Sequence, residues 1–377
     1  MMKRRFMKAA GVSARARTVL AAIRRHGSVS RAVLIRETGL SGTAIFRATE
    51  ELEIAGLARA GETVAAGRGQ PSNIIHIVPD AAFALGLSVM TDRADVVLLD
   101  LAGCVRARAE ITMPGMPRAA LLDAAAAFGT EALSSLGIEP SRLNGLGIAV
   151  AGFFVGPDMV NPSGELEDWA LVDLRADASR RLALPVVVEN IASAAALGER
   201  MLGVGSRYGS SCYINVASGF GAGIIVDGML MRGRHGNAGE IAGLFPMAGR
   251  VTPNLATLRA CLADHAVPTA GIADMVARFD PAWPGVEAWL AEHQPSFSYL
   301  FGVLRRTLDC EAMILGGRLP RVLARRIVDA VEWPETTLTD RRATRAPMTL
   351  LDVASLEPDL AGPLGAASLV FHRTLFD

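Results

Sequence analysis

The sequence predicts an α/β protein that begins with a small winged helix-turn-helix and continues into two α/β lobes. Residues 28–57 contain two short helical patterns joined by a tight turn, and two strand-like runs around a glycine-rich turn follow them. From Phe83 to the carboxyl end, strand and helix patterns alternate, which predicts α/β lobes.

Capping residues mark both short helices. Ser30 is a suitable N-cap for the first helix, and Gly39 can adopt the left-handed conformation that ends it. Ser41 is the expected N-cap of the second helix. Helical spacing of the second helix places Ile45, Leu52 and Ala55 inward. Its outward face is small and polar, as contacts with bases and phosphates require, and consists of Gly42, Thr43, Phe46 and Arg47. An ordinary helical hairpin is the alternative.

The two strand-like runs predict a β-hairpin wing. They cover residues 57–60 and 74–77 and flank the glycine-rich residues 66–71. Arg68 lies between two glycines, of which Gly69 is the second, so its backbone can approach DNA closely, as minor-groove arms do.

Charge divides the chain into two parts. The whole sequence is neutral, yet residues 1–80 hold 13 basic and six acidic side chains, a net charge of +7, which leaves −7 on the remainder. A basic head on an acidic body indicates a nucleic-acid-binding segment fused to a part with another task.

Length and composition exclude several classes of protein. At 377 residues, 51% of them hydrophobic, the chain is expected to form two or three domains with substantial cores. Apolar stretches such as residues 146–155 are too short to span a bilayer, so no membrane role is expected. The four cysteines, at positions 104, 212, 261 and 310, lack the spacing of a zinc site or a disulfide framework. They are expected to be free thiols of a protein located in the reducing cytoplasm.

The body predicts two similar sets of elements. The first has strands at 83–90, 96–101 and 104–112, a helix at 118–136 and a strand at 146–150. The second has a strand at 186–188, a helix at about 191–202, strands at 211–216 and 222–226, and further helices. A strand at 312–315, a turn at Gly316-Gly317 and a helix near 364–375 complete the chain. Two lobes with a cleft between them are the simplest assembly.

Six segments of the chain occur in the order found in one known family. They are the helix-turn-helix, residues 188–199 (Val-Glu-Asn-Ile-Ala-Ser-Ala-Ala-Ala-Leu-Gly-Glu), the loop 218–228, residues 236–241 (Gly-Asn-Ala-Gly-Glu-Ile), the turn 314–317, and residues 362–367 (Gly-Pro-Leu-Gly-Ala-Ala). With these segments the chain resembles the ROK family (repressors, open reading frames and kinases) over nearly its whole length.

This resemblance implies a two-lobed actin-like, ribonuclease H-like sugar-kinase fold behind a winged helix-turn-helix. The expected division is a DNA-binding domain at 1–80, a first lobe at 81–185 and a second lobe at 186–377, with the final helix able to pack back on the first lobe.

Departures from the family's kinases imply that the chain is not an enzyme. Where those kinases have Asp-x-Gly-Gly-Thr to hold ATP phosphates and magnesium, this chain has Leu-Ser-Val-Met-Thr-Asp-Arg at 87–93. Where they have the Asn-Asp pair whose aspartate is the catalytic base, it has Asn190-Ile191, and isoleucine cannot accept a proton. The retained loop 218–221 is explained equally by an ordinary glycine turn, so no nucleotide cofactor is expected.

Zinc is not expected either. The family often follows Glu-x-Gly-His with a cysteine-rich zinc knuckle. Here Glu240-Ile241-Ala242-Gly243 lacks the histidine, and residues 244–258 hold no cysteine. His235 is a lone histidine, which is more often exposed to solvent than a ligand.

Part of the family's sugar pocket remains. The resemblance implies that Asn190 and Glu240 bind sugar hydroxyls, since amide and carboxylate groups together donate and accept hydrogen bonds. Asn161, Glu165 and Asp168 are weaker candidates from a sugar-side loop. The alternatives are that Asn190 caps the following helix and that Glu240 belongs to an internal hydrogen-bond network.

Together these features predict a cytoplasmic transcriptional regulator, a repressor of carbohydrate-related genes. Its expected partners are operator DNA, a sugar or sugar derivative as effector, and a second copy of the chain. Thr43, Phe46 and Arg47 are expected to contact bases or backbone and Arg68 the adjacent groove, while phosphate contacts fall to Ser30, Arg31, Ser41 and Gln70. A homodimer or higher homo-oligomer is expected because one winged helix reads only a half-site. A regulator controlled by a protein partner and an ATP-dependent sugar kinase are the alternatives.

Overall fold

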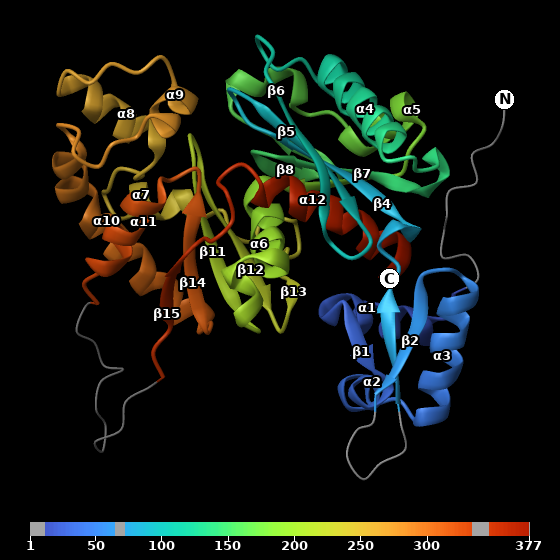
Figure 1. Cartoon of the computed structure of the whole chain (residues 1–377). Coiled ribbons are helices and arrows are strands. Elements are labelled where there is room, and N and C mark those ends of the chain that lie inside the picture. Colours follow the sequence, from blue (N-terminus) through green and yellow to red (C-terminus); the bar gives the residue numbers. More distant parts are fainter. Residues whose placement is uncertain (1–11, 65–71, 334–346, 377) are drawn as a thin grey trace, which may run out of the picture.

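A computed structural model describes residues 12–64, 72–333 and 347–376. Figure 1 shows a small amino-terminal head beside a body of two lobes, with the carboxyl terminus next to the head.

The head consists of three helices and a three-stranded sheet. Its helices are α1 (Ala14–His26), α2 (Arg31–Thr38) and α3 (Gly42–Ile54), and its strands are β1 (Ser28–Ser30), β2 (Ala58–Val64) and β3 (Ser72–Ile77). The predicted caps are present: the Oγ atoms of Ser30 and Ser41 accept hydrogen bonds from the amides of Val33 and Ala44, at 3.4 and 3.3 Å. Gly39 ends α2 in the left-handed conformation, with φ of 68°.

Two details of the head differ from the prediction. Ala55 was expected to face inward, but α3 ends at Ile54, so Ala55 is its exposed C-cap and Ala48 and Thr49 fill the inward positions instead. The short strand β1 was not expected. It pairs antiparallel with β3, which gives the sheet order β1-β3-β2.

The first lobe is built on a five-stranded sheet of order β10-β7-β4-β5-β6. Its strands are β4 (Phe83–Val89), β5 (Ala94–Asp100), β6 (Val105–Ile111), β7 (Leu143–Val150) and β10 (Val186–Asn190). The helices α4 (Arg118–Ser135) and α5 (Leu174–Leu182) and the small hairpin of β8 (Phe153–Gly156) and β9 (Met159–Asn161) complete the lobe.

The second lobe repeats this topology with the sheet order β13-β12-β11-β14-β15. Its strands are β11 (Ser211–Val216), β12 (Phe220–Val226), β13 (Met229–Leu230), β14 (Ala312–Gly317) and β15 (Leu350–Val353). The helices around it are α7 (Leu244–Met247), α8 (Leu255–Asp264), α9 (Ile272–Ala277), α10 (Val286–Leu308) and α11 (Arg321–Asp329). In each sheet, three consecutive antiparallel strands are followed by two parallel ones.

The expected lobe boundary at residue 186 is wrong. The segment Val186–Asn190 was assigned to the second lobe, but as β10 it pairs in parallel with β7 of the first sheet. The physical reason is the crossover through α5, which returns the chain to the sheet it has just left. The second lobe therefore begins after Asn190.

Two helices lie between the sheets. These are α6 (Ile191–Leu202) and α12 (Ala361–Phe371), which is followed by a π-helical turn, η6 (His372–Phe376). Both helices pack tightly: a side chain at Gly365 would stand 2.6 Å from the carbonyl carbon of Ala194, and one at Gly223 of β12 would stand 2.5 Å from the Ala192 oxygen. At Gly86 and Gly147, strands β4 and β7 approach the backbone of α12 as closely. The first-lobe sheet, α12, α6 and the second-lobe sheet thus form consecutive, closely packed layers.

Candidate functional site

A cleft of about 290 Å³ lies between the lobes and contains the motifs that the sequence analysis singled out. The end of β4, the start of α6, the loop before β12 and the segment before α12 all contribute to its walls. Of the five residues predicted to bind a ligand, it brings together Asn190, Glu240 and Glu165.

Asn190 occupies the junction of β10 and α6. Its Oδ1 atom caps α6 by accepting hydrogen bonds from the amides of Ala192, at 2.8 Å, and Ser193, at 3.4 Å. Its Nδ2 atom donates to the Gly152 carbonyl at 3.0 Å and to Glu240 Oε1 at 3.3 Å. The capping alternative therefore holds, and the same side chain also orients Glu240 at the cleft wall.

Glu240 is held by the loop that precedes η5 (Ile241–Gly243). Asn237 anchors this loop to the first lobe: its Oδ1 atom accepts a hydrogen bond from the Phe154 amide at 2.7 Å, and its Nδ2 atom donates to the Phe154 carbonyl at 2.9 Å. Partial burial raises the pKa of the Glu240 carboxyl group. A carboxylate of this kind is well suited to accept hydrogen bonds from ligand hydroxyls.

Asn161 and Asp168 are not among the residues that line the cleft. Asn161 pairs with Phe153 in the small hairpin. Asp168 lies in the 3₁₀ segment η3 (Gly164–Trp169) and points to α4, where its Oδ2 atom accepts a hydrogen bond from the Arg118 amide at 2.7 Å. It satisfies a free amide at the start of that helix, which accounts for its position.

Side chains line the part of the cleft where the resemblance implies that kinases of the family hold phosphates. Ser88 is 2% exposed and Met90 is buried. Ile191 lies beside them, and a side chain at Gly362 would stand 3.0 Å from Ser88 Oγ. This end of the cleft offers neither a metal-binding carboxylate at Ser88 nor a base at Ile191.

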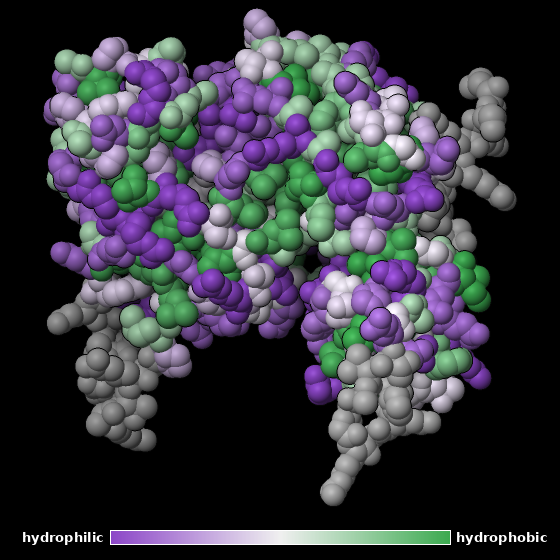
Figure 2. Space-filling view, viewed as in Figure 1, coloured by the Kyte–Doolittle hydropathy of each residue, from purple (hydrophilic) through white to green (hydrophobic). Residues whose placement is uncertain are grey.

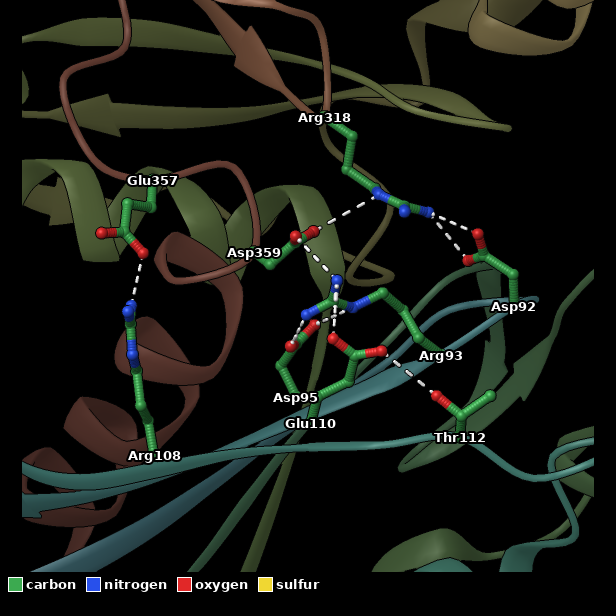
Figure 3. Close-up of polar contacts among 9 residues, drawn as sticks. All are labelled: Asp92, Arg93, Asp95, Arg108, Glu110, Thr112, Arg318, Glu357 and Asp359. Atoms are coloured by element: carbon green, nitrogen blue, oxygen red, sulfur yellow. Dashed lines mark hydrogen bonds and ion pairs between the residues drawn. The ribbon is translucent and has the colours of Figure 1, made fainter. Parts of the chain in front are cut away.

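Arg318 was missed by the sequence analysis. It follows the Gly316-Gly317 turn at the end of β14, and its buried guanidinium group lies between two acidic residues of other elements (Figure 3). Its Nη1 atom is 2.8 Å from Asp92 Oδ1 in the first-lobe hairpin, and its Nε atom is 3.3 Å from Asp359 Oδ1 before α12. An ion pair thus joins the two lobes across the cleft.

A second arginine extends this cluster on the first lobe. Arg93 pairs with Asp95, with Glu110 at 3.1 Å and with Asp359 at 3.1 Å (Figure 3). Burial raises the pKa of Asp95 to about 6, despite its hydrogen bond to Arg93. Asp359 therefore receives one arginine from each lobe.

No group of three or more His, Cys, Asp or Glu side chains suited to a metal ion occurs in the described part of the chain. His235 is exposed. Nor does any helix within residues 12–64, 72–333 and 347–376 have the length and apolar character to cross a membrane.

The candidate DNA-binding surface is the outer face of α3. Gly42, Thr43, Phe46 and Arg47 are all exposed, as predicted, and Phe46 is 50% exposed despite its apolar ring. The guanidinium carbon of Arg31 lies 5.0 Å from the centre of this ring, so α2 and α3 present one surface. Arg68, Gly69 and Gln70 lie outside the described residues. On the face drawn in Figure 2, hydrophilic residues cover much of the head.

Comparison with known proteins supports the resemblance found in the sequence. Residues 84–261 match the family model described as "ROK family". The chain carries a ROK domain. It is 25% identical over 365 residues to protein y4fQ of Sinorhizobium fredii, covering 96% of this chain and 91% of that protein. It is 27% identical over 232 residues to the xylose repressor of Bacillus subtilis, covering 59% of this chain and 58% of the repressor.

Solved structures share the fold at low identity. A ROK family transcriptional regulator, a homologue of the Escherichia coli MLC protein, superposes with a TM-score of 0.71 at 20% identity and 96% coverage of both chains. A ROK glucokinase from Streptomyces griseus, crystallised with glucose and AMPPNP, gives a TM-score of 0.59 at 22% identity, covering 76% of this chain and 99% of the kinase. The two-lobed sugar-kinase-like fold expected from the sequence is thereby confirmed.

Proposed function

We propose that this ROK protein is a transcriptional repressor that binds operator DNA through its head and senses a sugar or sugar derivative in the cleft between its lobes. The observation that carries the proposal is the combination of an exposed α3 face with a kinase-like cleft whose sugar side keeps Asn190 and Glu240. The same cleft has Ile191 and the Arg318 ion pair where phosphoryl transfer needs a base and a nucleotide.

On the DNA side, α3 enters the major groove. Thr43, Phe46 and Arg47 contact base edges or the adjoining backbone, with Gly42 allowing close approach. Phosphate contacts come from Ser30, Arg31, Ser41 and Gln70, and Arg68, which precedes Gly69, reaches the neighbouring groove. A homodimer places two heads on two half-sites.

On the ligand side, two of the relatives are named for regulation: the xylose repressor of Bacillus subtilis and the DNA-binding transcriptional dual regulator NagC of Escherichia coli. The lining of the cleft fits a polyhydroxy ligand, since the carboxylates of Glu165 and Glu240 offer hydrogen-bond acceptors and Asn190 orients Glu240. Ligand binding shifts the population of lobe closures and thereby the spacing of the two heads.

DNA binding is tested by selection from a random duplex pool with the full chain. The wild type should enrich a two-fold symmetric sequence, and Arg47→Ala should bind the enriched duplex about tenfold or more weakly. Arg207→Ala, which removes an exposed arginine of the body, is the matched control and should leave affinity unchanged. Absence of enrichment by the wild type would refute the DNA-binding half of the proposal.

Ligand sensing is tested by thermal unfolding of the full chain with a panel of pentoses, hexoses and amino sugars. At least one should raise the unfolding temperature, and Glu240→Gln should reduce that rise. Stabilisation by none of them would favour the alternative regulator that responds to a protein partner. ATP-dependent phosphorylation of any sugar by the purified chain would establish the kinase alternative instead.

A further inference from the structure

The head and the body share one hydrophobic core. Buried residues of α1, such as Leu20 and Ile23, belong to the same cluster as Leu364, Phe371 and Leu375 of α12 and η6. Helix α1 packs directly on η6. The head is therefore docked on the carboxyl-terminal end of the helix that lies between the lobes (Figure 1).

Arg24 of α1 is the polar centre of this contact. Its guanidinium carbon lies 5.3 Å from the ring centres of both Phe371 and Phe376, and its Nη2 atom donates to Ser368 Oγ at 3.5 Å. Its Nε atom is buried and has no hydrogen-bond partner within the described residues. Burial lowers the pKa of Arg24 to about 10, so the group still carries its charge at neutral pH. Asp100 at the end of β5 also attracts this charge. A buried cation that lies against two aromatic rings is sensitive to small movements of those rings.

The other end of α12 lies in the ligand cleft. Pro358, Asp359 and Gly362 line the cleft, and Asp359 receives Arg318 from the second lobe and Arg93 from the first. Eleven residues of α12 separate the two ends, a span of roughly 16 Å at the rise of an α-helix.

Helix α6 packs directly on α12. Four pairs of positions meet: Ile191 with Gly362, Gly198 with Ala361, Ala194 with Gly365, and Met201 with Ser368. Their amino-terminal ends, with Asn190 and Gly362, lie at the cleft, and their carboxyl-terminal ends lie at Arg24. Because no side chain fits at Gly365, the two helices cannot slide past each other without separating.

We propose that α6 and α12 move as a rigid pair, so that a structural change in the cleft displaces the DNA-binding head. Arg24 is the residue that couples the head to this helix pair. This inference rests on the proposed function of the cleft as a ligand site. A change in the ion pairs of Asp359 shifts the start of α12. The rings of Phe371 and Phe376 move with the helix, which weakens their contacts with the guanidinium group of Arg24.

The test uses hydrogen–deuterium exchange of the full chain without DNA, so that it is independent of the operator. Arg318→Ala perturbs the cleft end and should accelerate exchange across α1 by about fivefold or more, since the docked helix opens more often. In an Arg24→Ala background, where the link is already cut, Arg318→Ala should change α1 exchange by less than about twofold.

Arg25→Ala is the matched control, because Arg25 is the next residue of α1 and pairs within the head, 3.4 Å from Glu37. In that background the effect of Arg318→Ala should persist. Arg24→Met, which keeps an apolar stem, replaces Arg24→Ala if circular dichroism shows loss of fold. An unchanged α1 in Arg318→Ala, or equal changes in the wild-type and Arg24→Ala backgrounds, would overturn the coupling. Failure to select DNA would instead concern only the proposed function.

Discussion

Replacement of Gly365 by alanine tests the packing of α12 on α6. Helix propensity alone predicts that Gly365→Ala stabilises the protein by about 1 kcal/mol, because Gly365 lies inside α12. The structure predicts the opposite sign. The new methyl group would overlap the Ala194 carbonyl oxygen and would stand 2.6 Å from its carbon, whereas real Cβ atoms essentially never come within 3.0 Å of another heavy atom, so the helices must separate by more than about 1 Å.

Separation of that size forfeits a quarter to a half of the dispersion energy across the contact, and overpacking of a core costs about 1–3 kcal/mol. With the propensity gain subtracted, we expect a net destabilisation of about 1 kcal/mol. The assay is urea unfolding followed by circular dichroism. Gly243→Ala is the control, since nothing lies within 4 Å of its added methyl group and its backbone is already helical, so it should be neutral or slightly stabilising. A Gly365→Ala variant as stable as wild type or more stable would refute the close packing.

Three further outcomes are expected. Asn190→Ala removes the N-cap of α6 and should lower the free energy of unfolding by about 1 kcal/mol, and Asn254→Ala at the N-cap of α8 should do the same. Only Asn190→Ala should also weaken the binding of a ligand found in the thermal panel. Equal effects of the two variants on ligand binding would refute the dual role of Asn190. The folded-state pKa of Asp95 is raised to about 6, so the folded protein binds a proton at a pH where the unfolded chain does not. The urea concentration at the midpoint of unfolding should therefore increase when the pH is lowered from about 7 to about 5, and Asp95→Asn should lack this increase. Identical pH profiles of wild type and Asp95→Asn would contradict this prediction. Sugar phosphates should stabilise the chain less than their parent sugars in thermal scans, because Arg318 is already paired with Asp92 and Asp359; stronger stabilisation by the phosphates would contradict the assigned charge of the cleft.

Features set by neighbouring residues could be predicted from the sequence. Helix α6 has the predicted limits Ile191–Leu202 because its N-cap, Asn190, is local and its apolar residues keep helical spacing. The same reasoning located α2, α3 and the first three strands of the first sheet, β4, β5 and β6. The inward place given to Ala55 was wrong because the end of a helix is decided by the chain that follows it.

Features set by distant residues could not be predicted in this way. Which sheet β10 joins depends on its pairing with β7, whose partner positions lie 40 residues earlier, as Val186 and Leu146 show. Arg318 has no local signal beyond the glycine turn before it, since Asp92 and Asp359 come from other elements. Asp168 looked like a sugar ligand in sequence, but the chain turns it toward the free amide at the start of α4.

In the proposed function, one chain joins DNA binding to ligand sensing. The most direct test is the affinity of the full chain for its selected duplex, measured by fluorescence anisotropy with and without each saturating sugar of the panel. We predict that at least one sugar changes this affinity by about tenfold, equivalent to a coupling free energy of about 1.4 kcal/mol, and that Glu240→Gln reduces the change. An affinity that no sugar alters would contradict the claim.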